Sequence, residues 1–534
     1  EKAKLENQNA IENLKQTQFG LQRDGIMFPN KPQVDLTNGL DYDGNPITPS
    51  VNGSRNDWAT AGFFGRINYS YDGKYLLEAN LRADGTSRFR KGNQWKTFPS
   101  FSLGWNVARE HFFEPLNNIV NILKFRASYG LLGNQNTTNW YQTYQTMSVG
   151  SSNGAWLMNG NKPNTASAPG LVSASLTWET IESYNLGLDW GVFNNRLTGS
   201  FDWYIRDTKN MVGNAPELPA LLGTGVPITN NTDLRTSGWE LSIGWNDRLN
   251  NGFTYGAKFN VSDARTKITR YPNNPTKAVS TYIEGRYTNE IWGYTTVGLA
   301  KTDEEMQAHL ATMPNGGQSA LGSDWKAGDI MYADINGDGK ISGGSGTLND
   351  TGDWTVIGNT TPRYLFGLDL NASWKGFDLR MFFQGVMKRD FWQGSTYLFG
   401  ASNSGMWHAT GIESVSDYFR NDDTWSVQEG YQSPNLNSYL PRPLYSNKNL
   451  QTQTRYLQSA AYIRLKNLQL GYTFPTRLTS RYGVQNLRIY FSGENLWTGT
   501  SLVDQFDPET ISGGSGGNGY PLSRTLSCGL SVTF

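Results

Sequence analysis

Apolar and polar side chains alternate along the stretch LTGSFDWYIRDT, residues 197–208. Leu197, Gly199, Phe201, Trp203 and Ile205 fall on one face of an extended chain, and mostly polar residues lie between them. This period of two residues predicts a β-strand with one apolar face and one polar face. The chain holds roughly fourteen such segments, each close to the length of a tilted membrane-spanning strand. We therefore expect an all-β protein.

The connections between these segments also follow a pattern. Short turns at 71–74, 193–196, 249–252 and 375–376 alternate along the chain with much longer connections. A soluble β-sandwich would explain the alternation, but its core would consist of Val, Ile and Leu. Here the apolar face is rich in Trp, Tyr, Phe, Leu, Ala and Gly, with aromatic residues near segment ends, as in lipid-facing girdles. The pattern favours a transmembrane antiparallel β-barrel over the sandwich.

Composition limits the chemistry of the protein. The 46 basic residues balance the 46 acidic ones, so no net charge attracts the chain to nucleic acid. One cysteine, Cys528, and three histidines, His111, His309 and His408, provide neither a disulfide framework nor a Cys/His zinc set. No apolar run is long enough for a membrane helix, and no signal peptide opens the sequence, so we expect an export signal upstream of Glu1.

The final residues, LSCGLSVTF, form one more alternating segment that ends on Phe534. A final amphipathic strand with a terminal aromatic residue is what bacterial outer-membrane barrels present to their assembly machinery. An ordinary edge strand that happens to end in Phe is the plain alternative. Because similar segments precede it along the chain, we predict that Phe534 is an assembly signal.

Several longer blocks occur between residue 57 and the end of the chain. They are YLLEANLRADGTSRF (75–89), WKTFPSFSLGWNVAREHFF (95–113), LKFRASYGLLGNQN (123–136), GDIMYADINGDGKIS (328–342), TVIGNTTPRYLFGLDL (355–370), AAYIRLKNLQLGYTFP (460–475) and LRIYFSGENLWTGT (487–500). In this order, the blocks resemble the SusC/RagA family of TonB-dependent outer-membrane transporters of Bacteroidetes.

The resemblance implies a barrel of about 22 strands with a plug in its lumen. We therefore expect residues 57–534 to be the carboxy-terminal part of the barrel, without the plug domain, and residues 1–56 to be a loop and helix segment leading into it. Long extracellular loops are expected at 134–174, 300–361, 390–457 and 498–520. The alternative is a free-standing pore of about fourteen strands.

The stretch DINGDGKIS, residues 334–342, matches most of a calcium-binding EF-hand loop. Asp334, Asn336, Asp338, the Lys340 carbonyl and Ser342 fill the first five ligand positions, but the last position is Ser345, which is no bidentate acid. The resemblance indicates that Asp353, or less favourably Asp350, completes the shell. The alternative is a plain turn, since Asp, Asn and Gly are common turn residues. In either case the role would be structural, with calcium as a possible ion.

Nothing in the sequence supports an enzyme. The stretch GGSGG at 513–517 satisfies the G-x-S-x-G pattern, but it lies in a glycine-rich loop rather than between a strand and a helix. The long loops instead carry aromatic residues that could stack on sugar rings, or equally pack the loops and the membrane interface. These candidates are Trp140, Tyr141, Tyr144, Trp156, Phe391, Trp392, Tyr397, Trp407 and Trp425.

By resemblance, the sequence predicts active import of a large nutrient, an oligosaccharide, across the bacterial outer membrane. Energy would come from TonB acting on a plug outside this chain, and a SusD-like surface lipoprotein would form a lid, with a dimer of such pairs as one arrangement. Outer-membrane lipid would surround the barrel. One alternative is a peptide importer of the RagA kind, and another is a barrel that serves as a scaffold in a surface-assembly complex.

Overall fold

The computed structural model describes residues 57–534 apart from 138–139, 151–156, 161, 220, 222, 400–415 and 513–518. The expected helix near the amino terminus, and the whole of 1–56, lie outside the described residues. None of the described helices is long and apolar enough to cross a membrane.

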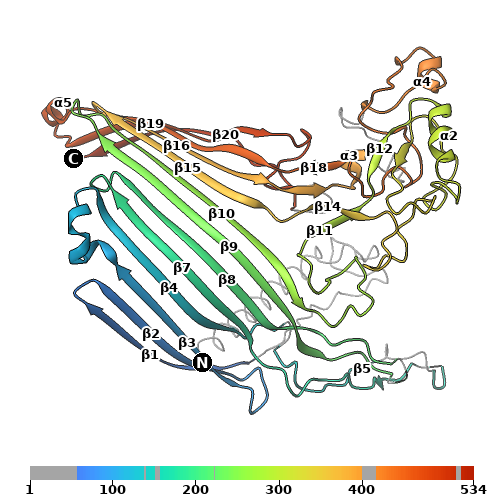
Figure 1. The fold of residues 1–534 in the computed structure, drawn as a ribbon, viewed down its shortest axis with the longest axis horizontal. Helices are drawn as coiled ribbons and strands as arrows, with labels where there is room; N and C mark the ends of the chain where they lie inside the picture. Colours follow the sequence, from blue (N-terminus) through green and yellow to red (C-terminus); the bar gives the residue numbers. More distant parts are fainter. Residues whose placement is uncertain are drawn as a thin grey trace, which may run out of the picture.

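One antiparallel sheet dominates the structure, and each of its strands pairs with its sequence neighbours in the sheet (Figure 1). Its thirteen strands are β1 (Thr60–Tyr71), β2 (Tyr75–Thr86), β3 (Trp95–Asn106), β4 (Val120–Asn134), β7 (Glu179–Val192), β8 (Leu197–Asn214), β9 (Ile228–Arg248), β10 (Thr254–Arg270), β15 (Arg363–Trp374), β16 (Phe377–Lys388), β19 (Tyr462–Thr473), β20 (Asn486–Thr500) and β21 (Thr525–Thr533).

The all-β prediction is confirmed, although the sheet has thirteen strands where about fourteen were expected. Short apolar runs pair in two-stranded sheets within the long connections and do not join the main sheet. These are β5 (Val149–Gly150) with β6 (Thr165–Ala166), β11 (Glu290–Gly293) with β14 (Thr355–Asn359), β12 (Thr296–Leu299) with β13 (Ile330–Tyr332), and β17 (Asp390–Trp392) with β18 (Leu457–Ser459).

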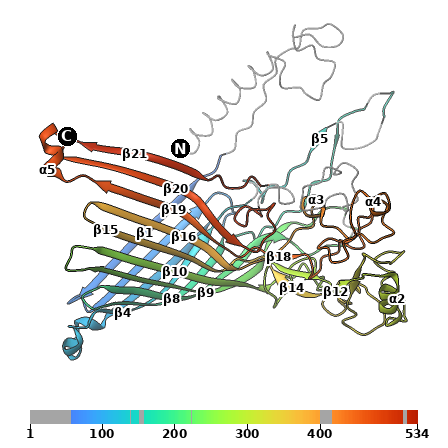
Figure 2. The same cartoon turned by 90° about the horizontal axis from the view of Figure 1, so that it is seen from above.

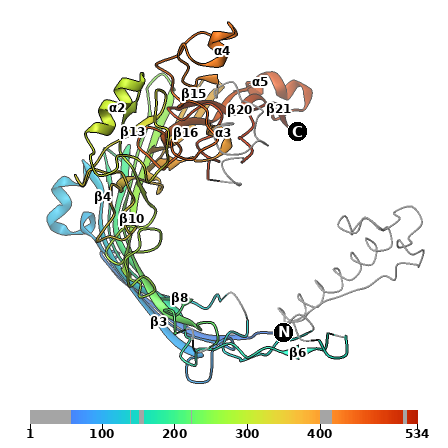
Figure 3. The same ribbon diagram turned by 90° about the vertical axis from the view of Figure 1, so that its right-hand side faces the viewer.

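The sheet curves into an arc and stays open (Figure 3). Its edges are β1 and β21, and neither edge has a second strand partner among the described residues. Large apolar side chains on the edges are exposed, including Ile67 at 68% and Leu530 at 64%. Each open edge presents unpaired backbone N–H and C=O groups, which can pair with another strand.

The two ends of the sheet differ in their connections (Figure 2). At the turn end, tight hairpins reverse the chain, as at Lys375 and Gly376, whose φ angles of 47° and 91° suit a two-residue turn. The longer connections at this end carry short helices. They are η1 (Val107–Arg109), η2 (His111–Leu116), α5 (Thr476–Thr479) and η7 (Ser480–Tyr482).

At the loop end, the described parts of three long connections pack together into what we call the loop lobe, made of 271–362, 389–461 and 501–524 (Figure 1). Its buried core includes Met306, Ile330, Tyr332, Tyr456 and Ile511, each at most 2% exposed. The lobe holds three short helices, α2 (Asp303–Ala311), α3 (Thr396–Phe399) and α4 (Trp425–Gln428). The loop end thus has an apolar core of its own.

Candidate ligand-binding wall and loop lobe

The polar face of the sheet carries a cavity of about 1010 Å³ near the loop end of β1 to β4. Strand alternation places Phe64 and Arg66 of β1 on this face, and Arg82 and Asp84 of β2 follow from the pairing of Phe64 with Arg82. Phe64 is 82% exposed, which is unusual for a large ring on a polar face. The cavity therefore combines an open aromatic surface with charged groups.

The charged groups of this cavity are held in place by hydrogen bonds from the arginine Nε atoms. The Arg82 Nε donates to both oxygens of Asp84, at 2.8 and 2.6 Å. Arg66 Nε donates to the Asn80 amide oxygen at 2.6 Å. Both arginine side chains are mostly exposed, at 62% and 61%, and the hydrogen bonds found for them among the described residues use Nε alone. Such an arrangement can bond hydroxyl, carbonyl or carboxylate oxygens of a ligand.

Buried rings form the base of this cavity. Phe98 and Trp178 contact edge to face with centroids 5.5 Å apart, and they are only 5% and 4% exposed. Trp178 donates its indole N–H to the Gln94 carbonyl. At the rim, the side-chain oxygen of Gln135 is buried and has no hydrogen-bond partner within the described part of the chain. An unpaired buried acceptor of this kind is a position for a donor from a ligand or water.

An ion-pair cluster stiffens the same face further along the sheet. The Arg126 guanidinium of β4 pairs with Asp189 of β7 and Asp202 of β8, with four N–O distances between 2.9 and 3.0 Å. Arg126 reaches the third strand by passing over Gly187, its direct neighbour in the register. A Cβ atom at Gly187 would lie 2.6 Å from the guanidinium carbon, so only glycine leaves room for this path.

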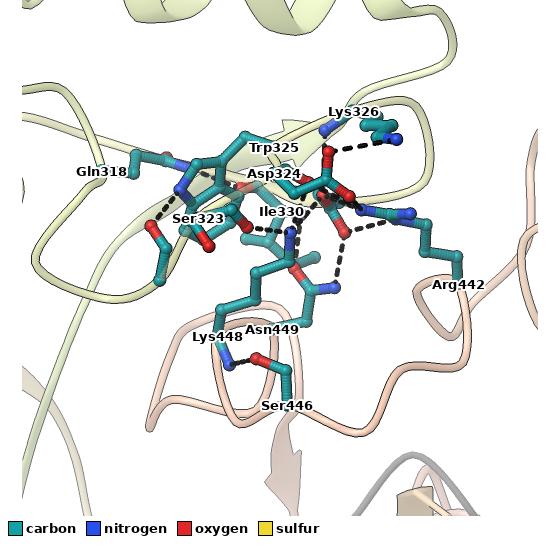
Figure 4. A network of polar contacts seen from close by, with 12 residues as sticks. Gln318, Ser323, Asp324, Trp325, Lys326, Ile330, Arg442, Ser446, Lys448 and Asn449 are labelled. Carbon is teal, nitrogen blue, oxygen red and sulfur yellow. Dashed lines mark hydrogen bonds and ion pairs between the residues drawn. The ribbon is translucent and has the colours of Figure 1, made fainter.

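Besides its apolar core, the loop lobe contains a buried carboxylate, that of Asp329. Figure 4 shows Arg442, Lys448 and Asn449, which surround it. Arg442 donates to both of its oxygens at 2.8 Å, Asn449 donates at 2.9 Å, and the Lys448 ammonium lies 2.9 Å away. Burial opposes ionisation of Asp329, but these donors outweigh it and hold the pKa of the carboxyl below its ordinary value. Burial lowers the pKa of Lys448. The network ties two connections that are far apart in sequence.

The DINGDGKIS stretch forms a tight loop stabilised by its own carboxylates. Asp334 accepts hydrogen bonds from the backbone N–H groups of Gly337 and Gly339, at 2.8 and 2.9 Å. Asn336 accepts from the N–H of Asp338, and Asp338 accepts from that of Lys340. The side chains of this loop therefore act first as acceptors for the backbone.

Asp353 lies against this loop and is fully buried. Its carboxylate accepts from the N–H groups of Ile335 and Ser342, at 2.8 and 2.9 Å. Burial raises the pKa of Asp353 despite these donors, and the charge of Asp334 adds to the rise. Asp350 instead bonds the backbone of Ser345 and Gly352. In the residues that the structure describes, no group of three or more His, Cys, Asp or Glu side chains is placed to hold a metal.

The predicted loop aromatics fall into separate groups. Trp140 contacts Trp58 edge to face at 5.6 Å, and the Arg88 guanidinium lies over both rings. Tyr141 contacts Tyr144, and its hydroxyl bonds the backbone of Asp57. These three candidates follow β4 in sequence, a few residues after Gln135 and Asn136, which line the polar-face cavity.

The other candidates belong to the loop lobe. Phe391 and Trp392 of β17 pack against its core, as the packing alternative proposed. Trp425 of α4 is 67% exposed and contacts only Tyr431 among the described rings, at 5.6 Å. Trp156, Trp407 and the GGSGG stretch lie outside the described residues, as does the side chain of Tyr397. No ring contact within the described ranges joins this group to the rings after β4.

The candidates predicted from the sequence lie in the loops, whereas the cavity is lined by strand residues that were not predicted, among them Phe64, Arg66, Arg82 and Asp84. One signal was available. In a strand of alternating faces, the adjacent pair Phe63 and Phe64 must place one ring on the polar side. Phe63 stacks on Trp95 on the apolar face, at 5.9 Å, and Phe64 is the ring that faces the cavity.

Most of the chain matches a known protein family. Residues 6–381 match the family model described as TonB dependent receptor-like, beta-barrel, and this is well over half of the 534 residues. The chain belongs to this family. Its members and the SusC and RagA relatives are outer-membrane β-barrels, so the sheet crosses the outer membrane. The predicted family resemblance and location are confirmed.

Several relatives within the family are similar to this barrel chain. TonB-dependent receptor P3 of Formosa agariphila is 29% identical over 93% of this chain and 48% of its own length. TonB-dependent receptor SusC of Bacteroides thetaiotaomicron is 27% identical over 88% of this chain and 43% of its own length. The chain thus spans about half the length of the curated relatives it matches.

A solved structure shares the fold of this TonB-dependent receptor barrel. The RagAB peptide importer in its open-open state superimposes with a TM-score of 0.69 at 23% identity, over 93% of this chain and 49% of that one. In barrels of this type the short turns face the periplasm and the long loops face outward. The turn end is accordingly periplasmic, and the cavity on the polar face lies in the outer half of the wall.

Proposed function

We propose that the complete protein imports a large nutrient, an oligosaccharide, across the outer membrane, with energy from TonB and with a SusD-like surface lipoprotein as its lid. The cavity on the polar face of β1 to β4 is the observation that supports an oligosaccharide most directly. It offers the exposed Phe64 ring for stacking and the exposed guanidinium groups of Arg66 and Arg82 for hydroxyl groups. A stacked ring flanked by polar groups is a common way to hold a ligand in orientation.

Two features of the loop lobe favour a partner protein at the outer surface. Its buried core and the Asp329 network make this part of the wall a firm platform for a lid rather than a set of loose loops. Exposed rings at its surface, including Trp425, Tyr431 and Tyr445 at 67–78% exposure, are suited to contact with another protein.

Import of a peptide is the second candidate. The fold agrees with RagAB, whose structure is described as that of a peptide importer, and the arginines of the cavity could equally bond peptide carbonyl or carboxylate groups. A scaffold role in a surface complex is the third reading, for which the loop lobe would be the binding surface.

Gene deletion followed by growth on single polysaccharides or on peptides separates these functions. We expect loss of growth on one class of polysaccharide, restored by the wild-type gene. Phe64→Ala should slow that growth, whereas its matched control Phe63→Ala, which alters the neighbouring ring on the opposite face, should not. Loss of growth only on peptides would favour the peptide importer. If the deletion strain grows normally on both polysaccharides and peptides but no longer assembles its surface complexes, the scaffold role is favoured.

We also propose that calcium completes the DINGDGKIS loop. The supporting observation is that Asp353 is buried beside Asp334, so that two negative charges lie close together at the loop. A bound cation would offset their repulsion. The carboxylates do not converge as a set of three, so the main-chain and amide oxygens of the loop would have to supply the remaining ligands.

A further inference from the structure

The apolar face of the barrel wall carries a groove of about 580 Å³ across β2, β3, β4 and β7. It lies on the face opposite the charged cavity and close to the periplasmic turns. The strand register shows how it is built. Leu77, Leu103, Ala127 and Leu186 stand side by side in one row across the four strands.

A second row, one step nearer the periplasm, consists of Tyr75, Trp105 and Phe125. Trp105 and Phe125 contact each other with ring centroids 6.2 Å apart. Ala127 is the one short side chain among these larger neighbours, and the groove opens over it. A recess bounded by rings and leucines, and facing the hydrocarbon of the membrane, fits a flexible apolar chain.

Polar groups stand at the periplasmic end of this groove. The Trp105 indole N–H donates to Glu110 at 3.0 Å, and the Lys74 ammonium lies 3.7 Å from the same carboxylate. Arg109 is exposed, lies over Gly73, and has no hydrogen-bond or ion-pair partner among the residues that the structure describes. Asp72 pairs with Lys74 at 3.5 Å, which leaves Arg109 as the cation available to an anion from outside the chain.

The juxtaposition of an apolar recess with an unpaired cation has the chemistry of a phospholipid site. We propose that the groove over Ala127 binds one acyl chain of a phospholipid in the periplasmic leaflet, whose phosphate contacts Arg109. Lipid A of the outer leaflet is the other source of acyl chains and phosphate. The groove favours the phospholipid because it opens beside the periplasmic turn at 72–74.

Lipid retention tests this site directly. The full outer-membrane protein is purified in mild detergent, and its bound lipids are counted by native mass spectrometry and identified after extraction. We expect about one retained phospholipid per wild-type protein, and a fall of about tenfold in Ala127→Trp, which fills the recess. Ala79→Trp is the matched control, because Ala79 is a half-buried alanine on the same face of β2 that does not line the groove.

Further variants separate the two parts of the proposal. Arg109→Gln should lower phospholipid retention while the barrel stays folded, as judged by heat-modifiable migration in gels. If Ala127→Trp does not fold, Ala127→Leu gives a milder filling of the same recess. Equal retention by the wild-type protein and a folded Ala127 variant would overturn the groove. Unchanged phospholipid retention by Arg109→Gln would contradict the proposed contact between Arg109 and the phosphate. Retention of lipid A in place of phospholipid would contradict the proposed location in the periplasmic leaflet.

Discussion

The Asp329 carboxylate and the Arg442 guanidinium form a bidentate ion pair across 113 residues of sequence, with both N–O distances at 2.8 Å. Asp329 is fully buried and Arg442 is mostly so. Their pairing fixes the connection after β10 against the connection after β16. Together with the apolar core, this pair joins two connections of the loop lobe that are distant in sequence.

Removing one partner of this pair should loosen the loop lobe. Arg442→Ala leaves the buried Asp329 charge short of a donor, and we expect a loss of about 3–5 kcal/mol in the local stability of the lobe. Hydrogen exchange of the lobe measures this effect. Lys326→Ala is the control within the lobe, because its exposed pair with Asp324 is worth about 0–1 kcal/mol. Equal protection in both variants would show that the lobe does not rely on Asp329.

The same network should make the lobe sensitive to acid. The pKa of Asp329 is held below its ordinary value of 3.8, so the folded lobe binds fewer protons than the unfolded chain near that pH. Its stabilising contribution is present above pH 3.8 and is lost as the pH falls through the lowered pKa. Limited proteolysis of the lobe across pH 2 to 6 measures this, and Asp329→Asn should flatten the dependence. A wild-type profile that matches Asp329→Asn would contradict this role.

Gly187 should tolerate no side chain. Gly187→Ala forces the Arg126 guanidinium away from Asp202, and we expect a loss of about 1–3 kcal/mol in barrel stability. Urea unfolding in detergent gives the value. Gly65→Ala is the matched control, because a Cβ atom there meets nothing within 4 Å. If both alanine variants unfold at the same urea concentration, the contact of Arg126 with Asp202 does not depend on the space above Gly187.

Calcium binding at the DINGDGKIS loop has a direct test. The double change Asp334→Ala and Asp338→Ala should abolish any rise in melting temperature on adding calcium, while the barrel still inserts. It should also lower the stability of the loop without calcium, since Asp334 accepts two backbone N–H groups. The two effects are separated by melting with and without a chelator. A calcium dependence that persists in the double variant would rule out this site.

Deletion of Phe534 should impair assembly in the outer membrane. The ring is 81% exposed, so its loss removes little packing and any defect belongs to assembly. The fraction of heat-modifiable barrel in isolated outer membranes measures the effect, with Phe534→Tyr as the control that keeps an aromatic end. Normal assembly after deletion would show that the terminal signal is redundant.

Most of the strands and their apolar and polar faces could be predicted from the sequence, because side chains on a strand alternate with a period of two residues. LTGSFDWYIRDT became β8, with Phe201 and Trp203 on the apolar face, and TonB-dependent family membership was visible in the sequence blocks. The contacts between distant side chains could not be predicted in this way, because they depend on the three-dimensional fold. Arg126 reaches Asp202 through the gap at Gly187, and Asp329 reaches Arg442 between two distant connections. Local patterns do not encode such contacts, because register and loop packing bring the partners together across long stretches of chain.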